Sequence, residues 1–356
     1  MDWPAKSPQS SSGLAQFAAG LSKRLAEENP NNNLVFSPLS IYTALSLLAA
    51  GASDATLNEI LRILGARSCG ELESFVSRMA ADALQDRSAS GGPRVAFACG
   101  VWSDLSRPLK TAFREAVVGT YKAEASTVNF RGAPEEARGQ INAWAAQITP
   151  SSATPCTLRA SGRTSRSTGG TPCTNPSTGS TAARSTCPSC RVQCRSSSLC
   201  TTGSRYSNSV IRAAPLVYSG PDRTGYTQFS MCIFLPDAHD GMWWLLETSR
   251  PGFLHDHLPE QQIALCEFRM PKFKLSFHSS IVAVLKKLGL ELPFCERGNL
   301  SDMVEDDGSS LPVVVGDVIH KAVVEVNKEG TEAAAVMDEA TGAVVFAGHF
   351  LDPSKE

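Results

Sequence analysis

Two valine-rich runs near the C-terminus, with an alanine-rich stretch between them, constrain the fold of this chain most. The runs are residues 318–326 and 343–350, and Gly, Asn and Thr residues bound them. Runs of this length and composition are typical of buried β-strands. Between them lies Asn-Lys-Glu-Gly-Thr-Glu-Ala-Ala-Ala, residues 327–335. We therefore predict two core strands that are joined by a segment of small residues.

The N-terminal region predicts an amphipathic helix, a short strand and a second, buried helix. Apolar residues recur at helical spacing in the first helix: Leu14, Phe17, Ala18, Leu21 and Leu25. Leu34–Phe36 is a short apolar strand. Ser37 then suits the N-cap, and Pro38 suits the first helical position, where no backbone donor is needed. We expect this second helix to end at Gly51.

Another helix is predicted to begin at Pro134. Glu135 and Glu136 lie in its first turn, where carboxylates interact favourably with the helix dipole. Its sequence continues with Ala-Arg and then with Ile141-Asn142 and Trp144. The order of elements up to this point is a succession of helices and strands of ordinary globular composition.

At these motifs the chain resembles the serpins, a family of protease inhibitors, over residues 14–144 and 216–353. The sequences at 141–145 and 346–354 are similar to those of cereal members. The resemblance implies a mixed α+β fold, in which helices pack on a large central β-sheet beside smaller sheets. It also implies a monomer that is not an enzyme, has no catalytic residues, and needs no cofactor or metal.

The resemblance assigns two groups of functional residues. The reactive-loop hinge, which in the family inserts into the central sheet, matches Glu329, Gly330, Thr331, Glu332, Ala333, Ala334 and Ala335. The hydrogen-bonded cluster where that sheet opens matches Ser37, Ser40 and His320. From the residues alone, Ser37 could be only a helix cap, His320 a core histidine, and the alanines the start of a loop or helix.

The stretch that follows the hinge is short. Only 11 steps separate Gly330 from Thr341, and fully extended they span roughly 36 to 40 Å. The family pattern has a long exposed loop here, followed by two strands, before the closing strand. We therefore expect this chain to lack an adequate reactive loop.

The composition changes abruptly at residues 148–211. Between Ser151 and Cys200 the chain is rich in Ser, Thr, Cys and Arg and has no Asp, Glu, Lys or aromatic residue. Such a segment buries too little apolar area to offset the entropy of ordering it, so we predict disorder. A shifted reading frame would also explain it. The predicted organisation is one serpin-like domain, with an N-terminal half at 1–147 and a C-terminal half at 212–356, that lacks a central strand.

The remaining polar residues include two groups of residue types that bind metals. Cys187 and Cys190 have the spacing of half a zinc site, with Cys194 and Cys200 nearby, but without a matching second pair we favour an accident of composition. His255 and His257 could bind a metal, but they lie in a predicted surface turn. No sequence motif of a nucleophile, phosphate loop or dinucleotide site is present.

The arginines of residues 148–211, with no acid between Ala137 and Pro221, could bind nucleic acid through its phosphates. Because no aromatic residue of the Arg-rich stretch 151–200 could stack on bases, we favour a solvated tail and no specific nucleic-acid partner. The net charge of −2 does not favour an anionic membrane surface. The N-terminus has no secretory signal pattern, so the default is a cytoplasmic protein with reduced thiols. Extracellular release, as in some family members, stays open.

These observations favour a non-inhibitory serpin, which keeps the hinge but lacks an adequate reactive loop. The alternative is a serine or cysteine protease inhibitor that acts by the family's suicide-substrate mechanism, with a protease as its partner. A third hypothesis is an interaction protein that binds through the Arg-rich segment.

Overall fold

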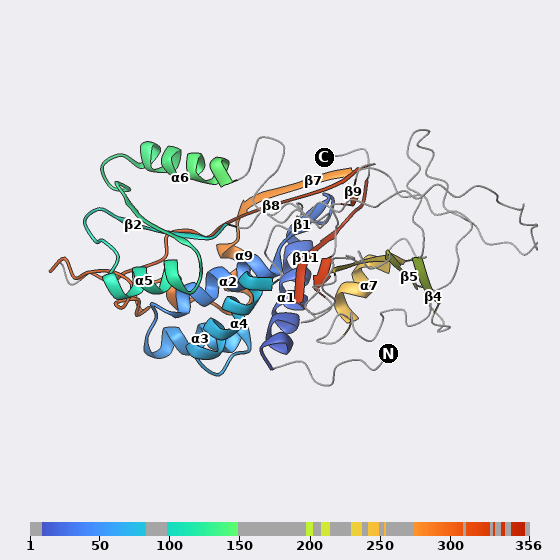
Figure 1. Cartoon of the computed structure of the whole chain (residues 1–356), viewed down its shortest axis with the longest axis horizontal. Helices are drawn as coiled ribbons and strands as arrows, with labels where there is room; N and C mark the ends of the chain where they lie inside the picture. Colours follow the sequence, from blue (N-terminus) through green and yellow to red (C-terminus); the bar gives the residue numbers. More distant parts are fainter. Residues whose placement is uncertain are drawn as a thin grey trace, which may run out of the picture.

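The computed structural model describes residues 9–82, 98–148, 197–201, 208–213, 229–236, 241–248, 253, 273–308, 311–327, 330–331, 336–338 and 343–352. Figure 1 shows their arrangement, with the helices of the N-terminal part gathered beside the strands of the C-terminal part. The cysteines at 187, 190 and 194 and the histidines at 255 and 257, which were weighed as metal ligands and not favoured, lie outside the described residues.

Four helices form the N-terminal part: α1 (Gln9–Glu28), α2 (Pro38–Ala49), α3 (Asp54–Leu64) and α4 (Cys69–Asp82). The apolar side of α1 is buried as predicted, since Leu14, Leu21 and Leu25 are at most 1% exposed. Helix α2 begins at Pro38, after its N-cap Ser37, and ends two residues before the predicted Gly51. In α2, the ring of Tyr42 packs edge-on against Phe17 and Phe75, which ties three helices together.

The remaining helices are shorter or lie further along the chain: α5 (Thr111–Gly119), α6 (Pro134–Ile148), α7 (Gly241–Thr248), α9 (Val282–Lys287) and the 3₁₀ turn η2 (Leu292–Phe294). The predicted start of α6 at Pro134 is confirmed. The ring of Trp144 on α6 lies 4.7 Å from that of Trp102, so α6 contacts strand β2 (Gly100–Asp104) through this aromatic pair.

The largest sheet has six antiparallel strands in the order β1-β11-β10-β6-β5-β4. Their bounds are β1 (Leu34–Phe36), β11 (Ala343–His349), β10 (Val336–Asp338), β6 (Phe229–Pro236), β5 (Asn208–Ala213) and β4 (Ser197–Thr201). The predicted strand at 343–350 is therefore confirmed as β11. It pairs with the N-terminal strand β1, so the two ends of the chain's sequence meet in one sheet.

The other described strands form two separate groups. Strands β2 and β3 (Glu124–Val128) are parallel neighbours. Strand β8 (Ile319–Asn327), the other predicted valine-rich strand, pairs with β7 (Phe273–Ser280) on one side and with the two residues of β9 (Gly330–Thr331) on the other. Among the described strands, no ladder joins the β2–β3 pair to β8.

Residues 148–211 contain two strands that the composition does not predict. The structure has β4 and the start of β5 within this segment, and β5 pairs along its whole length with β6 and also pairs with β4. The expected disorder of the segment stays a prediction. A pairing partner from elsewhere in the chain provides the backbone hydrogen bonds that the local sequence does not favour. Most of the segment, and with it the expected loss of a central strand, lies outside the described residues.

The described core is centred on α1, α2, β1 and β11. Its fully buried members include Phe36, Ile41, Tyr42, Val345 and Phe346. The core therefore joins residues from the two ends of the sequence. Within the described part of the chain, no helix is both long enough and apolar enough to cross a bilayer.

Candidate functional site

Ser37, which stands between β1 and α2, makes three hydrogen bonds through its hydroxyl and its backbone N–H. Its Oγ accepts from the Ser40 backbone N–H at 3.1 Å, which is the N-cap contact predicted from the sequence. The same hydroxyl donates to the Val345 carbonyl oxygen at 2.7 Å, and the Ser37 backbone N–H donates to Nε2 of His320 at 3.0 Å. Ser37 therefore links the start of α2 to β11 and β8.

His320 is buried, with 6% of its surface exposed, and its ring lies 6.2 Å from that of Phe277 on β7. Burial lowers the pKa of His320 from 6.5 to about 3. Because Nε2 accepts a hydrogen bond from Ser37, the neutral ring carries its proton on Nδ1. The imidazole is therefore an uncharged link between β8 and the start of α2 at neutral pH.

The structure brings the three predicted residues of the sheet-opening cluster together. Ser37 caps α2, Ser40 lies in the first turn of that helix, and His320 is the second residue of β8. The cluster also includes a partner that the sequence does not indicate, which is the carbonyl of Val345 on β11. No residue pattern identifies a backbone carbonyl as a partner, so sequence reasoning could not have found it.

The contact between Ser37 and His320 does not have the geometry of a nucleophile and its base. In such a pair the imidazole nitrogen accepts the proton of the serine hydroxyl. Here Nε2 is occupied by a backbone N–H, and the hydroxyl donates to a carbonyl oxygen instead. Both residues are buried, at 0% and 6% exposure. The arrangement holds three elements together and provides no exposed reactive atom.

Two residues of the predicted hinge fall in the described part of the chain. Gly330 pairs with Asn327, and Thr331 pairs with Val326, so the start of the hinge lies as β9 along the edge of β8. Glu329, Glu332 and Ala333–Ala335 lie outside the described residues. The two described residues of the predicted hinge therefore lie in the same small sheet as His320.

The chain then enters a different sheet. Val336, Met337 and Asp338 form β10, which pairs with β6 on one side and β11 on the other. Only four residues, 332–335, separate the last residue of β9 from the first residue of β10. Five Cα steps reach about 18 Å when fully extended.

Among the described residues, no three His, Cys, Asp or Glu side chains are grouped as metal ligands would be. One polar cluster was not predicted from the sequence. In this cluster, Nη2 of Arg107 lies 2.6 Å from Oδ1 of Asp307. The two residues are 200 positions apart, and neither stands in a recognisable motif.

Comparison with known proteins identifies the family. The model of the family described as serpin (serine protease inhibitor) matches residues 12–159 and 213–350. A rice (Oryza sativa subsp. japonica) protein named as a candidate serpin-Z8 is 42% identical, over 97% of this chain and 96% of its own length. Serpin-Z4 of barley (Hordeum vulgare) is 33% identical, over 92% of this chain and 91% of its own length.

A solved structure agrees with the sequence relatives. The structure of Arabidopsis AtSerpin1 in its native stressed conformation superposes with a TM-score of 0.76 at 28% identity, covering 97% of this chain and 98% of its own. The fold is therefore the serpin fold, mixed in helices and sheets. Since the family model covers most of the chain and the relatives are all but fully covered, the chain belongs to the serpin family and is a plant serpin.

Proposed function

We propose that this chain is a non-inhibitory serpin, which keeps the hinge of the family but lacks a loop long enough to trap a protease. Serpins in general are inhibitors of proteases and not enzymes, and the contacts of Ser37 and His320 agree with a structural role. The observation that carries the proposal is the short connection between β9 and β10, which lie in different sheets.

The register of β9 against β8 shows what insertion would require. Gly330 pairs with Asn327 and Thr331 with Val326, so the same register continued would place Ala335 opposite Ala322 and Asp338 opposite Ile319. To fill the edge of β8 along its nine residues, the inserting strand would have to include all of β10. Insertion beyond Ala335 would therefore break the ladders of β10 with β6 and β11.

The relatives support the same proposal. The alignment with the rice relative extends over 407 positions, while this chain has 356 residues. That relative therefore has stretches for which this chain has no counterpart. The family model also leaves residues 160–212 outside its match. We propose that the short connection after Thr331 is one of the places where this chain lacks residues that the rice relative has.

Incubation with proteases tests the proposal. We expect trypsin-like, chymotrypsin-like and papain-like enzymes to keep their activity in the presence of the full chain, and we expect no SDS-stable complex on a gel. A serpin that inhibits the same enzyme serves as the positive control. A complex that survives SDS would overturn the proposal.

The second candidate is a serpin inhibitor of serine or cysteine proteases, and the pairing of Gly330 and Thr331 with β8 favours it because the hinge is already aligned. The variant Thr331→Arg tests the inhibitory candidate against the non-inhibitory one. If a complex formed and depended on insertion, this variant would abolish it, because a long charged side chain does not fit within a packed sheet.

We also propose that the protein acts in the cytoplasm as a monomer. Cys69, Cys99 and Cys295 carry free thiols. Reduced thiols are typical of the cytosol. Thiol titration of the native protein and light scattering would test the two parts of this proposal, and a disulfide-linked or oligomeric protein would contradict them.

A further inference from the structure

Two segments that are distant in the sequence meet beyond the end of β2, and together we call them the clamp. One is residues 104–110, which lead from β2 to α5, and the other is residues 302–308 with Leu311, which precede β8. Leu109 and Val304 form an antiparallel bridge at their centre. Two main-chain hydrogen bonds flank this bridge: Lys110 N to Met303 O (3.0 Å) and Glu305 N to Pro108 O (2.8 Å).

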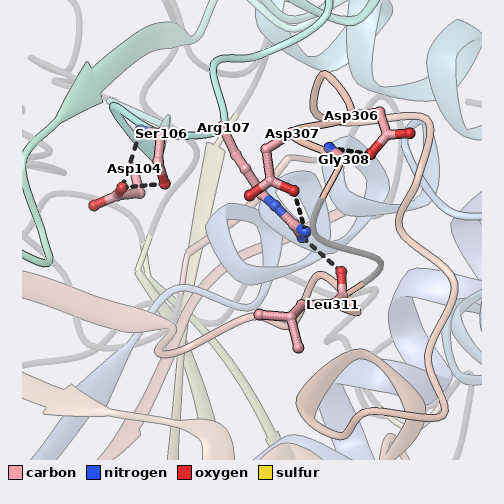
Figure 2. A network of polar contacts seen from close by, with 7 residues as sticks. All are labelled: Asp104, Ser106, Arg107, Asp306, Asp307, Gly308 and Leu311. Carbon is pink, nitrogen blue, oxygen red and sulfur yellow. Dashed lines mark hydrogen bonds and ion pairs between the residues drawn. The ribbon is translucent and has the colours of Figure 1, made fainter.

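The side chain of Arg107 completes the clamp (Figure 2). Its Nη2 lies 2.6 Å from Asp307 Oδ1, and its Nη1 donates to the Leu311 carbonyl oxygen at 2.7 Å. The side chains of Arg107 and Asp307 are only 12% and 16% exposed. The hydrogen bond with Asp307 raises the pKa of Arg107, so the guanidinium stays charged. One side chain therefore holds two points of the opposite segment.

Both sides of the clamp are held in shape by their own contacts. Asp306 Oδ1 accepts from the Gly308 N–H at 2.9 Å, and Gly308 has the positive φ of +70° that this tight turn needs. On the other side, Asp104 accepts from the N–H of Ser106 at 3.0 Å and from its hydroxyl at 2.6 Å. The second carboxylate oxygen accepts from the Arg131 N–H at 3.1 Å, which adds the segment between β3 and α6. The two turns therefore place the side chains of Asp307 and Arg107 within hydrogen-bonding distance of each other.

The clamp connects two parts of the molecule that share no sheet. Strands β2 and β3 with α5, which we call the β2–β3–α5 unit, have no ladder to β8 among the described strands. In Figure 1 the β2–β3 pair lies toward the end of β8 that is opposite to β9. On the core side, the hydroxyl of Tyr121 in this unit donates to the Ser46 carbonyl at 3.0 Å. The clamp is the polar attachment to the segment that leads into β8.

We propose that Arg107 closes a clamp that holds the β2–β3–α5 unit against the segment that leads into β8, and that loss of this side chain loosens both the unit and the start of β8. Charge-assisted hydrogen bonds such as those of Arg107 cost free energy to break, so their loss lowers the cost of local opening. The proposal goes beyond the inhibitory or non-inhibitory nature of the protein, because it rests on contacts outside the hinge and the sheet-opening cluster.

Hydrogen exchange of the native full chain, followed by mass spectrometry, tests the clamp. In Arg107→Ala we expect exchange in residues 100–104, 124–128 and 319–321 to become about tenfold faster or more, since charge-assisted hydrogen bonds are lost. Exchange in α3 should not change. Arg107→Lys should act in the same direction, because an ammonium group cannot reproduce the two-pronged contact of guanidinium.

Two further variants make the test specific. Arg138→Ala removes the same charge from an ion pair with Glu135 that is 72% and 78% exposed, and we expect it to leave exchange unchanged. Asp307→Ala should reproduce the pattern of Arg107→Ala, and the double variant should add little to either. The proposal is overturned if exchange near the clamp does not change, or if it rises equally in α3, which would make Arg107 a general stabiliser.

Discussion

Ser37 and His320 show how one buried contact can serve several elements. The serine caps α2, holds the carbonyl of Val345 and donates its N–H to the imidazole of His320. Since His320 is buried and uncharged, protonation would both place a charge in the core and remove the acceptor that Ser37 uses. The cluster is therefore sensitive to pH even though it has no catalytic geometry.

The pKa of His320 predicts acid sensitivity of the fold. The unfolded chain takes up a proton at this residue below pH 6.5, whereas the folded chain does so only near pH 3. The unfolding free energy should therefore fall as the pH drops through this window, by about 2 kcal/mol between pH 7.5 and 5. Urea unfolding at pH 7.5 and pH 5 measures the loss.

The variant His320→Gln provides the comparison. It removes this titrating group but keeps the other histidines, including His349, whose pKa burial also lowers. We expect the wild type to lose about 2 kcal/mol more than the variant between the two pH values. Equal losses in the two proteins would show that His320 does not control the acid sensitivity.

Strand β11 is held at both its edges and beyond its end. It pairs with β1 and β10, and the segment that follows it is bonded to the turn that precedes β1. The side chain of Asn33 makes three hydrogen bonds to this segment: Nδ2 to Asp352 O (2.7 Å), and Oδ1 from Leu351 N (2.9 Å) and from Asp352 N (3.1 Å). One amide side chain therefore closes the end of the strand pair.

We expect Asn33→Ala to lower the unfolding free energy by about 1 to 3 kcal/mol, because three hydrogen bonds are lost and backbone groups lose their partners. Chemical denaturation gives the change. Asn32→Ala is the matched control, since Asn32 contacts His349 Nε2 through its backbone carbonyl at 2.9 Å, which the substitution retains. A loss as large in Asn32→Ala as in Asn33→Ala would contradict this assignment.

Some parts of the described molecule are joined to the core by fewer strand pairs than others. The core around α1, α2, β1 and β11 is continuous and fully buried. In contrast, the ladders that connect β4, β5 and β6 to β11 pass through the three residues of β10. Parts that share few contacts with the core unfold at lower free energy than the core itself.

We therefore predict that the chain unfolds with weak cooperativity. Scanning calorimetry should give a van't Hoff enthalpy below the calorimetric enthalpy, with a broad or two-step transition. The helical core should keep its hydrogen-exchange protection after β4–β6 have lost theirs. A single sharp transition with equal enthalpies would contradict the prediction.

Much of the fold could be predicted from local sequence, because the causes are local. Helix α2 begins where Ser37 and Pro38 satisfy the needs of a helix start, and α1 buries the face on which its leucines recur. The valine-rich runs became β8 and β11. Strands β4 and β5 could not be predicted, since their pairing depends on β6 and not on their own composition.

The sequence by itself determined most of the N-terminal helices, the two valine-rich strands, the family pattern and the short connection after Thr331. Only the tertiary structure decided the partners: His320 lies 283 positions from Ser37, and Asp307 lies 200 positions from Arg107. A hydrogen bond or ion pair forms wherever the folded chain places a donor beside an acceptor. Local composition does not determine which distant residues the fold brings together. The sheet-opening cluster could therefore be predicted only from the family resemblance, and the clamp only from the structure.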